Sequence, residues 1–365
     1  MVAERAFSRH TGGGSPRGVW SIRSFRNDDP PTLCRLWRES QLGRGAAYRF
    51  PVDWFDQVVL SQLHFDPAGL LLACVDGKVV GYAHAASPFA GRPWDATCRD
   101  GVISAVVVHP EMRRRGIGRA LVDACCVYLV ERGCRRVVAG ESAPCDPFYQ
   151  GLYGSARGVG FLDSDWDAAP FFTSIGFAPF LRWSVHTRSV TGRPEPFDPR
   201  AAAIRRQFEL HHSDVPPGHL DRWLNREARL DGVWFGLRPK GGGHPVAWCT
   251  AWPMNFHSAD REGACVGMGD LTVLPDHRRK GYAKVLLAET FKYLRAEHFE
   301  SVEIAIPESL TAGAEAPGTE ASTSEQTQAD GSAARGLLGA FGFRRIDAGT
   351  VFQKQLGIAE PPPSF

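Results

Sequence analysis

The sequence predicts an α/β (α+β) protein composed of two tandem copies of one domain. First, a glycine-containing segment at residues 113–119 lies between an apolar, strand-like run (102–108) and a stretch with apolar residues at helical spacing (117–128). Second, the same strand, turn and helix pattern returns around residues 278–284. Third, landmarks outside these segments recur at a nearly constant offset. Together these observations indicate an internal duplication.

Three pairs of landmarks are separated by 165 residues and a fourth pair by 166: Gly116 and Gly281, Pro110 and Pro275, Gly77 and Gly242, and Gly176 and Gly342. A chance match of a short motif would not preserve this spacing. We therefore predict a first domain at 19–190, a proline-containing linker at 191–200 and a second domain at 201–357. Residues 1–18 are basic and rich in Gly and Ser without an apolar core, which predicts a disordered N-terminal segment and not a secretory signal.

In the first domain, alternation at residues 20–25 predicts a strand, and turn formers at 27–30 open a short helix. Asp76-Gly77 between the apolar runs 69–75 and 78–84 predicts a hairpin. The strand at 102–108 leads into the motif and into a helix that ends near Gly133. A strand at 135–140, a short helix at 170–175 and a last strand at 180–190 complete the domain.

In the second domain we predict a helix at 201–210, a hairpin from 233–237 and 245–252, a central strand at 265–273 and a helix at 282–295. A strand at 302–306 follows, and one at 350–355 closes the sheet. No strand comparable to 20–25 is recognisable, so we expect this domain to lack one or to borrow it from the linker. Residues 311–332 are rich in Ala, Glu, Ser, Thr and Gly, which predicts a low-complexity loop.

The repeated motif has the chemistry of an anion site. Gly116 and Gly281 let the backbone approach a ligand without a Cβ in the way. The first turn of a helix has N–H groups without internal partners and the positive end of the helix dipole. Arginines in the motif add positive charge, so each copy is predicted to bind a phosphate group.

The spacing Arg-x-x-Gly-x-Gly, with a proline three positions upstream, differs from the P-loop and from the dinucleotide fingerprint. Both copies resemble the acetyl-CoA motif of the GNAT (Gcn5-related N-acetyltransferase) superfamily, and the order of predicted elements is similar to that fold. The resemblance implies two tandem GNAT-like domains, each a mixed, mostly antiparallel twisted sheet flanked by helices. It implies acetyl-CoA as the cofactor, with the pantetheine arm in the gap where the sheet splays beside the motif.

The resemblance also assigns the cofactor-binding residues to the motif and to the strand before it in each domain. These residues are Val106, Val107, Val108, Arg113, Arg114, Arg115, Gly116, Ile117, Gly118, Arg119, Leu271, Thr272, Val273, Arg278, Arg279, Lys280, Gly281, Tyr282, Ala283 and Lys284. A backbone N–H within either strand segment would polarise the thioester carbonyl.

Acetyl transfer to an amine also needs a group that removes the amine proton. Glu141, just past the strand at 135–140, is our candidate, and Asp270 is its counterpart in the second domain. The alternative for each is a solvated carboxylate in or beside a strand. Many GNAT members use a Tyr in a Phe-Tyr-x-x-x-Gly-Phe segment to protonate the leaving thiolate, but here Phe172 and Leu338 occupy that position.

Both positions lack a hydroxyl, so the proton for the thiolate would have to come from elsewhere. Tyr149 is our candidate for the group that protonates the thiolate, with Tyr153 or water as alternatives. A further alternative is that one or both domains bind the cofactor without turnover. Tyr149 and Tyr153 lie in residues 142–164, a segment rich in aromatics and turn formers whose counterpart is the loop at 311–332. In the GNAT fold this region borders the acceptor side of the cleft, so we place the acceptor site in the first domain. The alternative is that 142–164 only seals the interface between the domains.

Bulk properties exclude several classes of protein. A net charge of +2 does not favour nucleic acid as a partner, and arginines at a helix start suit CoA phosphates better. No apolar run approaches the ~18 residues of a membrane span. Nine cysteines without a C-x-x-C pair predict reduced, buried thiols in a cytoplasmic chain. His211, His212, His219 and His257 show no recurring ligand spacing, so no metal is predicted.

The leading hypothesis is an acetyl-CoA-dependent N-acetyltransferase. Its acceptor is an amine of unknown identity, on a small molecule or a protein, that attacks the thioester directly. We expect a monomer whose two domains form a pseudo-dimer. Two alternatives remain: one domain is catalytic and the other a non-catalytic scaffold, or the protein is an acyl-CoA-binding regulatory module without turnover.

Overall fold

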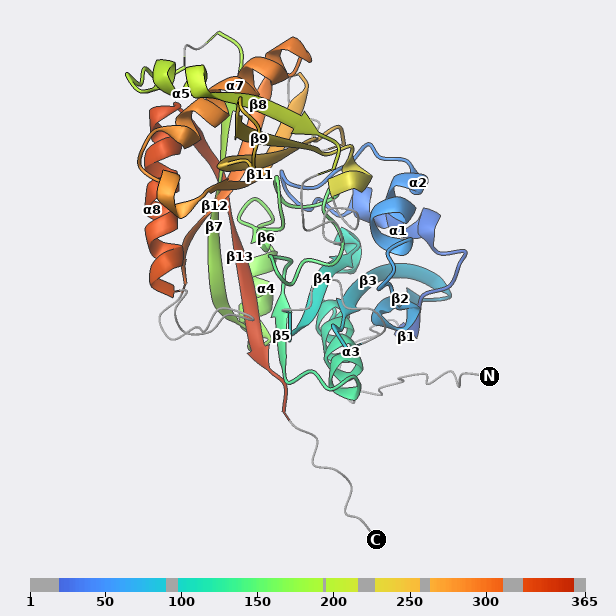
Figure 1. The fold of residues 1–365 in the computed structure, drawn as a ribbon. Coiled ribbons are helices and arrows are strands. Elements are labelled where there is room, and N and C mark those ends of the chain that lie inside the picture. Colours follow the sequence, from blue (N-terminus) through green and yellow to red (C-terminus); the bar gives the residue numbers. More distant parts are fainter. Residues whose placement is uncertain are drawn as a thin grey trace.

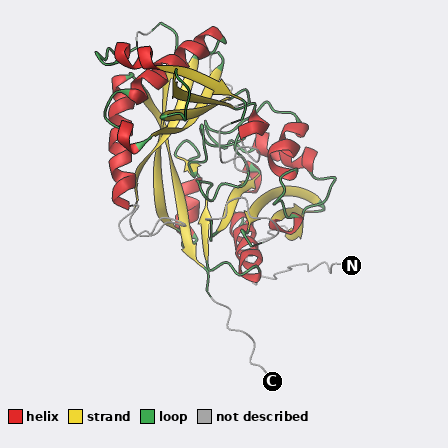
Figure 2. Ribbon diagram, viewed as in Figure 1, coloured by secondary structure: helices red, strands yellow, loops and turns green. Residues whose placement is uncertain are grey.

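The computed structural model describes residues 20–89, 98–192, 195–215, 227–256, 263–310 and 324–357. The predicted disordered segment at 1–18 lies outside these ranges, as do His219 and His257. The described chain forms one 13-stranded, mostly antiparallel sheet with helices around it (Figure 2). The predicted α/β fold class is confirmed.

The first half of the chain (residues 19–190) supplies the sheet strands and helices that precede the linker. They are β1 (Trp20–Ser24), α1 (Pro30–Glu39), α2 (Val52–Phe55), β2 (Leu70–Val75), β3 (Lys78–Ala86), β4 (Gly101–Val108), α3 (Ile117–Glu131), β5 (Arg136–Ala139), β6 (Phe161–Leu162), α4 (Ala168–Ser174) and β7 (Ala178–Ser189). The predicted hairpin is confirmed, with β2 and β3 joined by Asp76 and Gly77 at φ 48° and 74°. Positive φ at both positions is what such a tight turn requires.

The second half (residues 201–357) repeats most of this order. Its elements are α5 (Ala201–Gln207), β8 (Phe208–Ser213), β9 (Val233–Pro239), β10 (Ala247–Pro253), β11 (Cys265–Val273), α7 (Tyr282–Ala296), β12 (Ser301–Leu310), α8 (Ser324–Ala340) and β13 (Arg344–Gln355). The expectation that this half lacks a first strand of its own is wrong, because β8 pairs antiparallel with β9. Phe208 and Leu210 pack against the core while Glu209 is exposed, a period of two that the neighbouring charged residues concealed.

The predicted loop at 311–332 is also shorter than expected. Residues 324–332 belong to α8, whereas 311–323 lie outside the described residues. Ala, Glu and Gln are good helix formers, so a composition too polar to form a core can still be helical. Near the C-terminal end of α8, Leu338 packs with Ile304 and Ile306 of β12.

The two halves exchange their last strands. In the sheet, β13 lies between β5 and β7, and β7 lies between β13 and β12. Figure 1 shows β7 and β13 side by side through the middle of the molecule. The C-terminal strand therefore pairs with the first half, at Phe352 opposite Ala139, instead of closing the sheet of its own half. The domain boundaries drawn from the sequence stay a prediction, because one continuous sheet crosses them.

The largest hydrophobic core is shared between the halves. It contains Trp37 of α1 and Tyr149 of the segment 142–164, together with Trp252, Met254 and Cys265 of the second half. Fully burying a large apolar side chain contributes about 1.5–3 kcal/mol. The two halves therefore pack against one another through a shared core.

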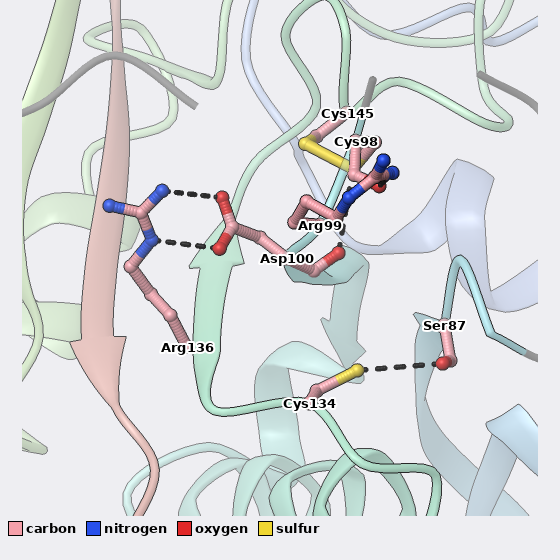
Figure 3. The surroundings of a disulfide bond; sticks show 7 residues. All are labelled: Ser87, Cys98, Arg99, Asp100, Cys134, Arg136 and Cys145. Carbon is pink, nitrogen blue, oxygen red and sulfur yellow. Dashed lines mark hydrogen bonds and ion pairs between the residues drawn. A yellow bond between two sulfur atoms is a disulfide. The ribbon is translucent and has the colours of Figure 1, made fainter. Parts of the chain in front are cut away.

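The prediction that all cysteines are reduced is wrong for one pair. Cys98 and Cys145 form a disulfide, with Cα atoms 5.7 Å apart (Figure 3). It joins the chain just before β4 to residues 142–164, beside the Asp100–Arg136 ion pair (2.7 Å). The other seven cysteines are free, and six of them are buried. The pairing is long-range, so spacing could not reveal it.

Within the described ranges, no helix is long and apolar enough to cross a bilayer. In the same residues no group of three or more His, Cys, Asp or Glu side chains is placed to hold a metal ion.

Candidate active site

The two repeated loops, at residues 113–119 (the first loop) and 278–284 (the second loop), have the same backbone conformation. Arg114 and Gly116 have φ of 62° and 84°, and Arg279 and Gly281 have 61° and 93°. The first Arg of each loop braces it, with Nε donating to the carbonyl of Val108 or Val273 at 3.1 Å. The N–H groups of residues 114–118 and 279–283 donate to no carbonyl of the described backbone. Such unsatisfied amides at a helix start form an anion-binding concavity.

The surroundings of the two loops differ. Gly116 is exposed, and a Cβ added there would meet nothing within 4 Å. At Gly281 a Cβ would lie 3.4 Å from Asp198 and Arg200 of the linker. Asp198 is buried and bonds Arg200 (2.9 Å) and Lys284 (3.4 Å), and the Arg200 hydrogen bond holds the pKa of this carboxyl well below its usual value. Residues of the linker therefore occupy the space beside the second loop, and Asp198 pairs with Lys284 of that loop.

The sheet splays beside each loop. β4 pairs with β5 only from Gly101 to Ile103, so β5 does not cover the later β4 residues, which include Val106, Val107 and Val108. β11 pairs with β12 only from Cys265 to Met268, which leaves Leu271, Thr272 and Val273 in the same situation. These are the strand residues predicted to border the cofactor. Both predicted strand segments therefore lie beyond the point where the pairing of the two parallel strands ends.

A small cavity occupies the gap in the first half. Its lining includes Ser104, Glu141, Tyr149 and Tyr153, and its volume is about 10 Å³, room for roughly one water molecule. Glu141 is 7% exposed and accepts a hydrogen bond from the Phe148 N–H at 2.8 Å. Both predicted catalytic residues, Glu141 and Tyr149, therefore border one cavity at the end of β5.

Tyr149 is held in place from several sides. Its ring stacks on Trp37 (centroids 5.5 Å apart, planes at 6°), and its hydroxyl lies 3.3 Å from His84 Nδ1. Its backbone has φ of 51°, a strained conformation for an aromatic residue. Burial raises the pKa of Tyr149 well above its usual value, and nearby Tyr82 and Glu141 add to the shift. This hydroxyl is protonated at neutral pH.

Tyr153, the alternative to Tyr149, is hydrogen-bonded to the backbone. The Tyr153 hydroxyl oxygen accepts a hydrogen bond from the Leu162 N–H at 3.0 Å. At the position of the missing family tyrosine, Phe172 is 1% exposed and stacks on Phe161 and Phe352. Phe172 therefore packs in the aromatic core and is not among the residues that line the cavity.

Sequence reasoning missed His84. It lies in the apolar run of β3, completely buried, with its ring stacked on Phe148 at 4.3 Å. A single His in an apolar strand is a signal of a satisfied core residue more often than of a site, and only the fold places it beside Tyr149.

Asp270, the counterpart of Glu141 in the second half, lies at the contact between the two halves. It forms an ion pair with Arg157, which comes from residues 142–164 of the first half. The same segment places the Ala156 carbonyl where the Trp252 indole donates to it at 3.0 Å. Residues 142–164 thus border the cavity of the first half and also contact the sheet of the second half, and the placement of the acceptor site in the first domain stays a prediction.

Comparisons with known proteins all point to one family. The model of the acetyltransferase (GNAT) family matches residues 31–160 and 201–315. An acetyltransferase of Pectobacterium atrosepticum is 32% identical over 116 residues, which are 32% of this chain and 72% of that protein. One of Sodalis glossinidius is 31% identical over 134 residues, 36% of this chain and 84% of that protein.

Solved structures show the same fold over nearly the whole chain. A tandem GNAT protein from the clavulanic acid biosynthesis pathway is 17% identical with a TM-score of 0.59, covering 93% of this chain and 99% of that one. A GCN5-related N-acetyltransferase from Sphaerobacter thermophilus is 17% identical with a TM-score of 0.55, covering 92% and 96%. At these identities the likeness concerns the fold alone.

Proposed function

The chain belongs to the acetyltransferase (GNAT) family, and on this premise we propose that its first half transfers the acetyl group of acetyl-CoA to an amine. The observation that carries the proposal is the conjunction of an open first loop, a splayed β4 and a cavity bordered by Glu141 and Tyr149. The second half has a similar loop, but Asp198 lies against it and its counterpart carboxylate is paired with Arg157.

The residues fit the cofactor. The amides of the first loop donate to no carbonyl of the described backbone, which suits binding of the CoA diphosphate, and the exposed Arg114 and Arg115 add positive charge. The later residues of β4 supply backbone donors for the thioester carbonyl. When bound, acetyl-CoA supplies the activated acetyl group.

The cavity residues divide the proton transfers. Glu141 takes a proton from the amine as its nitrogen attacks the carbonyl carbon. As the carbon–sulfur bond breaks, Tyr149 donates its hydroxyl proton to the departing sulfur. The cavity holds about one water in this conformation, so residues 142–164 must move to admit the reactants.

A matched pair of substitutions tests this assignment. Gly116→Val and Gly281→Val both place a β-branched residue at positive φ, and Gly281→Val adds close contacts with Asp198 and Arg200, so its cost in stability should be at least as large. We expect Gly116→Val to lower CoA affinity and amine-dependent CoA release at least tenfold, and Gly281→Val to leave both within about twofold. Calorimetry with CoA and thiol detection with a panel of amines measure the two quantities.

Equal losses from both substitutions would contradict the assignment to the first half. Tight CoA binding without release by any amine would support a second candidate, an acyl-CoA-binding module. One observation favours that candidate: neither Phe172 nor Leu338 carries a hydroxyl.

A further inference from the structure

His84 is a polar side chain in the hydrophobic core that no step of the proposed reaction uses. It lies opposite Ala105 of β4 in the sheet register and is 0% exposed. Phe148 stacks on one face of the imidazole, and Phe65 and Tyr149 meet it edge to face. Its Nδ1 lies 3.3 Å from the Tyr149 hydroxyl oxygen, and its Nε2 has no hydrogen-bond partner in the described part of the chain.

The imidazole is neutral at physiological pH. Burial lowers the pKa of His84 to about 3; nearby His64 acts in the same direction, and Asp66 opposes them only in part. A neutral imidazole has one N–H donor and one nitrogen lone pair. The environment of the two nitrogens therefore decides which one carries the hydrogen.

Burying an N–H donor without an acceptor costs more free energy than burying an acceptor without a donor. Buried N–H groups without an acceptor are rarer in proteins than buried acceptors without a donor, because an orphaned donor loses its only hydrogen bond. Hydrogen on Nε2 would leave such a donor, since Nε2 meets no acceptor. Hydrogen on Nδ1 instead donates to Tyr149 Oη and leaves the Nε2 lone pair unmet. The phenol hydrogen then needs another acceptor, but it can rotate about its C–O bond to reach one, whereas a hydrogen on Nε2 is fixed in the ring plane.

This tautomer determines where the Tyr149 proton points. With its oxygen accepting from His84, the hydroxyl must direct its own hydrogen elsewhere. We propose that His84 is a positioning residue whose Nδ1–H holds the Tyr149 oxygen, so that the phenol proton faces the cavity lined by Ser104 and Glu141. The inference rests on the proposed function, in which Tyr149 protonates the leaving sulfur.

The cavity side offers an orphaned partner as well. Ser104 is 7% exposed and lines the cavity, and its hydroxyl oxygen has no hydrogen-bond partner among the described residues. Tyr82 offers the competing direction for the phenol proton, because its buried hydroxyl lies close enough to Tyr149 to interact with it. A variant at Tyr82 therefore serves as the matched control.

Nitrogen-15 NMR of the full chain labelled at histidine tests the tautomer without any turnover. The signal lost in His84→Asn assigns the residue among the 12 histidines. We expect a neutral ring protonated at Nδ1 at pH 7. A ring protonated at Nε2, or at both nitrogens, would overturn the proposal.

Kinetics then test the positioning role. His84→Phe keeps a ring against Phe148 but removes the donor, and should lower kcat about tenfold; His84→Asn keeps an N–H near the Nδ1 position and should recover most of it. In a Tyr149→Phe background, His84→Phe should have almost no further effect, whereas a merely structural His84 would cause the same loss in both backgrounds.

Tyr82→Phe should leave kcat within about twofold of wild type. A loss equal to that of His84→Phe would instead show that the Tyr149 proton points to Tyr82, and would overturn the proposal. If the wild-type protein releases no CoA with any amine, the proposed function fails, while the NMR experiment still decides the tautomer. Near-ultraviolet circular dichroism verifies that each variant is folded.

Discussion

Replacing Cys98 and Cys145 with alanine should destabilise the protein by about 4 kcal/mol. The disulfide closes a loop with a sequence separation of 47 residues. In the chain-entropy description, removing a cross-link of this length returns about 4 kcal/mol of disorder to the unfolded chain at 25 °C. The bridge also ties residues 142–164, which carry Tyr149, to the chain before β4. Its loss should therefore raise hydrogen exchange in that segment more than elsewhere.

Denaturant unfolding of both proteins measures this difference. Cys134→Ala is the control, because Cys134 is buried and not bridged, so its substitution removes a sulfur without removing a cross-link. Thiol titration of the unfolded, unreduced protein should find seven free thiols of the nine cysteines. Nine titratable thiols before reduction would refute the reasoning. So would a double variant whose loss of unfolding free energy is no more than twice the loss caused by Cys134→Ala.

Three further predictions concern charged groups. Glu141→Gln should lower kcat at least ~100-fold with unchanged CoA affinity, measured by CoA release and calorimetry, because it removes the proposed base; near-normal kcat would dismiss Glu141 from that role. Arg157→Leu should lower the free energy of unfolding by only about 1 kcal/mol, measured with denaturant, because its ion pair with Asp270 is partly exposed. Asp270→Asn should add almost nothing in that background, because the contact is already lost, and full additivity would argue against the contact. Burial raises the pKa of Asp165 to about 6; nearby Arg113 lowers this pKa in part, and Asp167 raises it. Ionisation of Asp165 therefore lowers the stability of the native state as the pH rises from about 4 to 6. Asp165→Asn should consequently raise Tm at pH 8 and not at pH 4. An equal rise in Tm at both pH values would contradict the assignment.

Local chemistry determined the parts of the protein that the sequence predicted well. Gly116 and Gly281 follow arginines and open helices, and backbone conformation at such positions depends on residues within a few places along the chain. The two loops accordingly have nearly identical φ values in the structure. The hairpin at Asp76-Gly77 and the α/β class depend on similarly short-range signals. Placing Glu141 after β5 needed only the limits of that strand.

Tertiary structure alone decided which elements meet. The exchange of β7 and β13 depends on pairing between strands from opposite halves, and both strands carry the same kind of residues. The Cys98–Cys145 bridge, the Asp198 contact with Lys284 and the approach of His84 to Tyr149 each join residues far apart in the chain. Such contacts form because the whole core must bury its apolar surface at once, a condition that no short stretch of sequence contains.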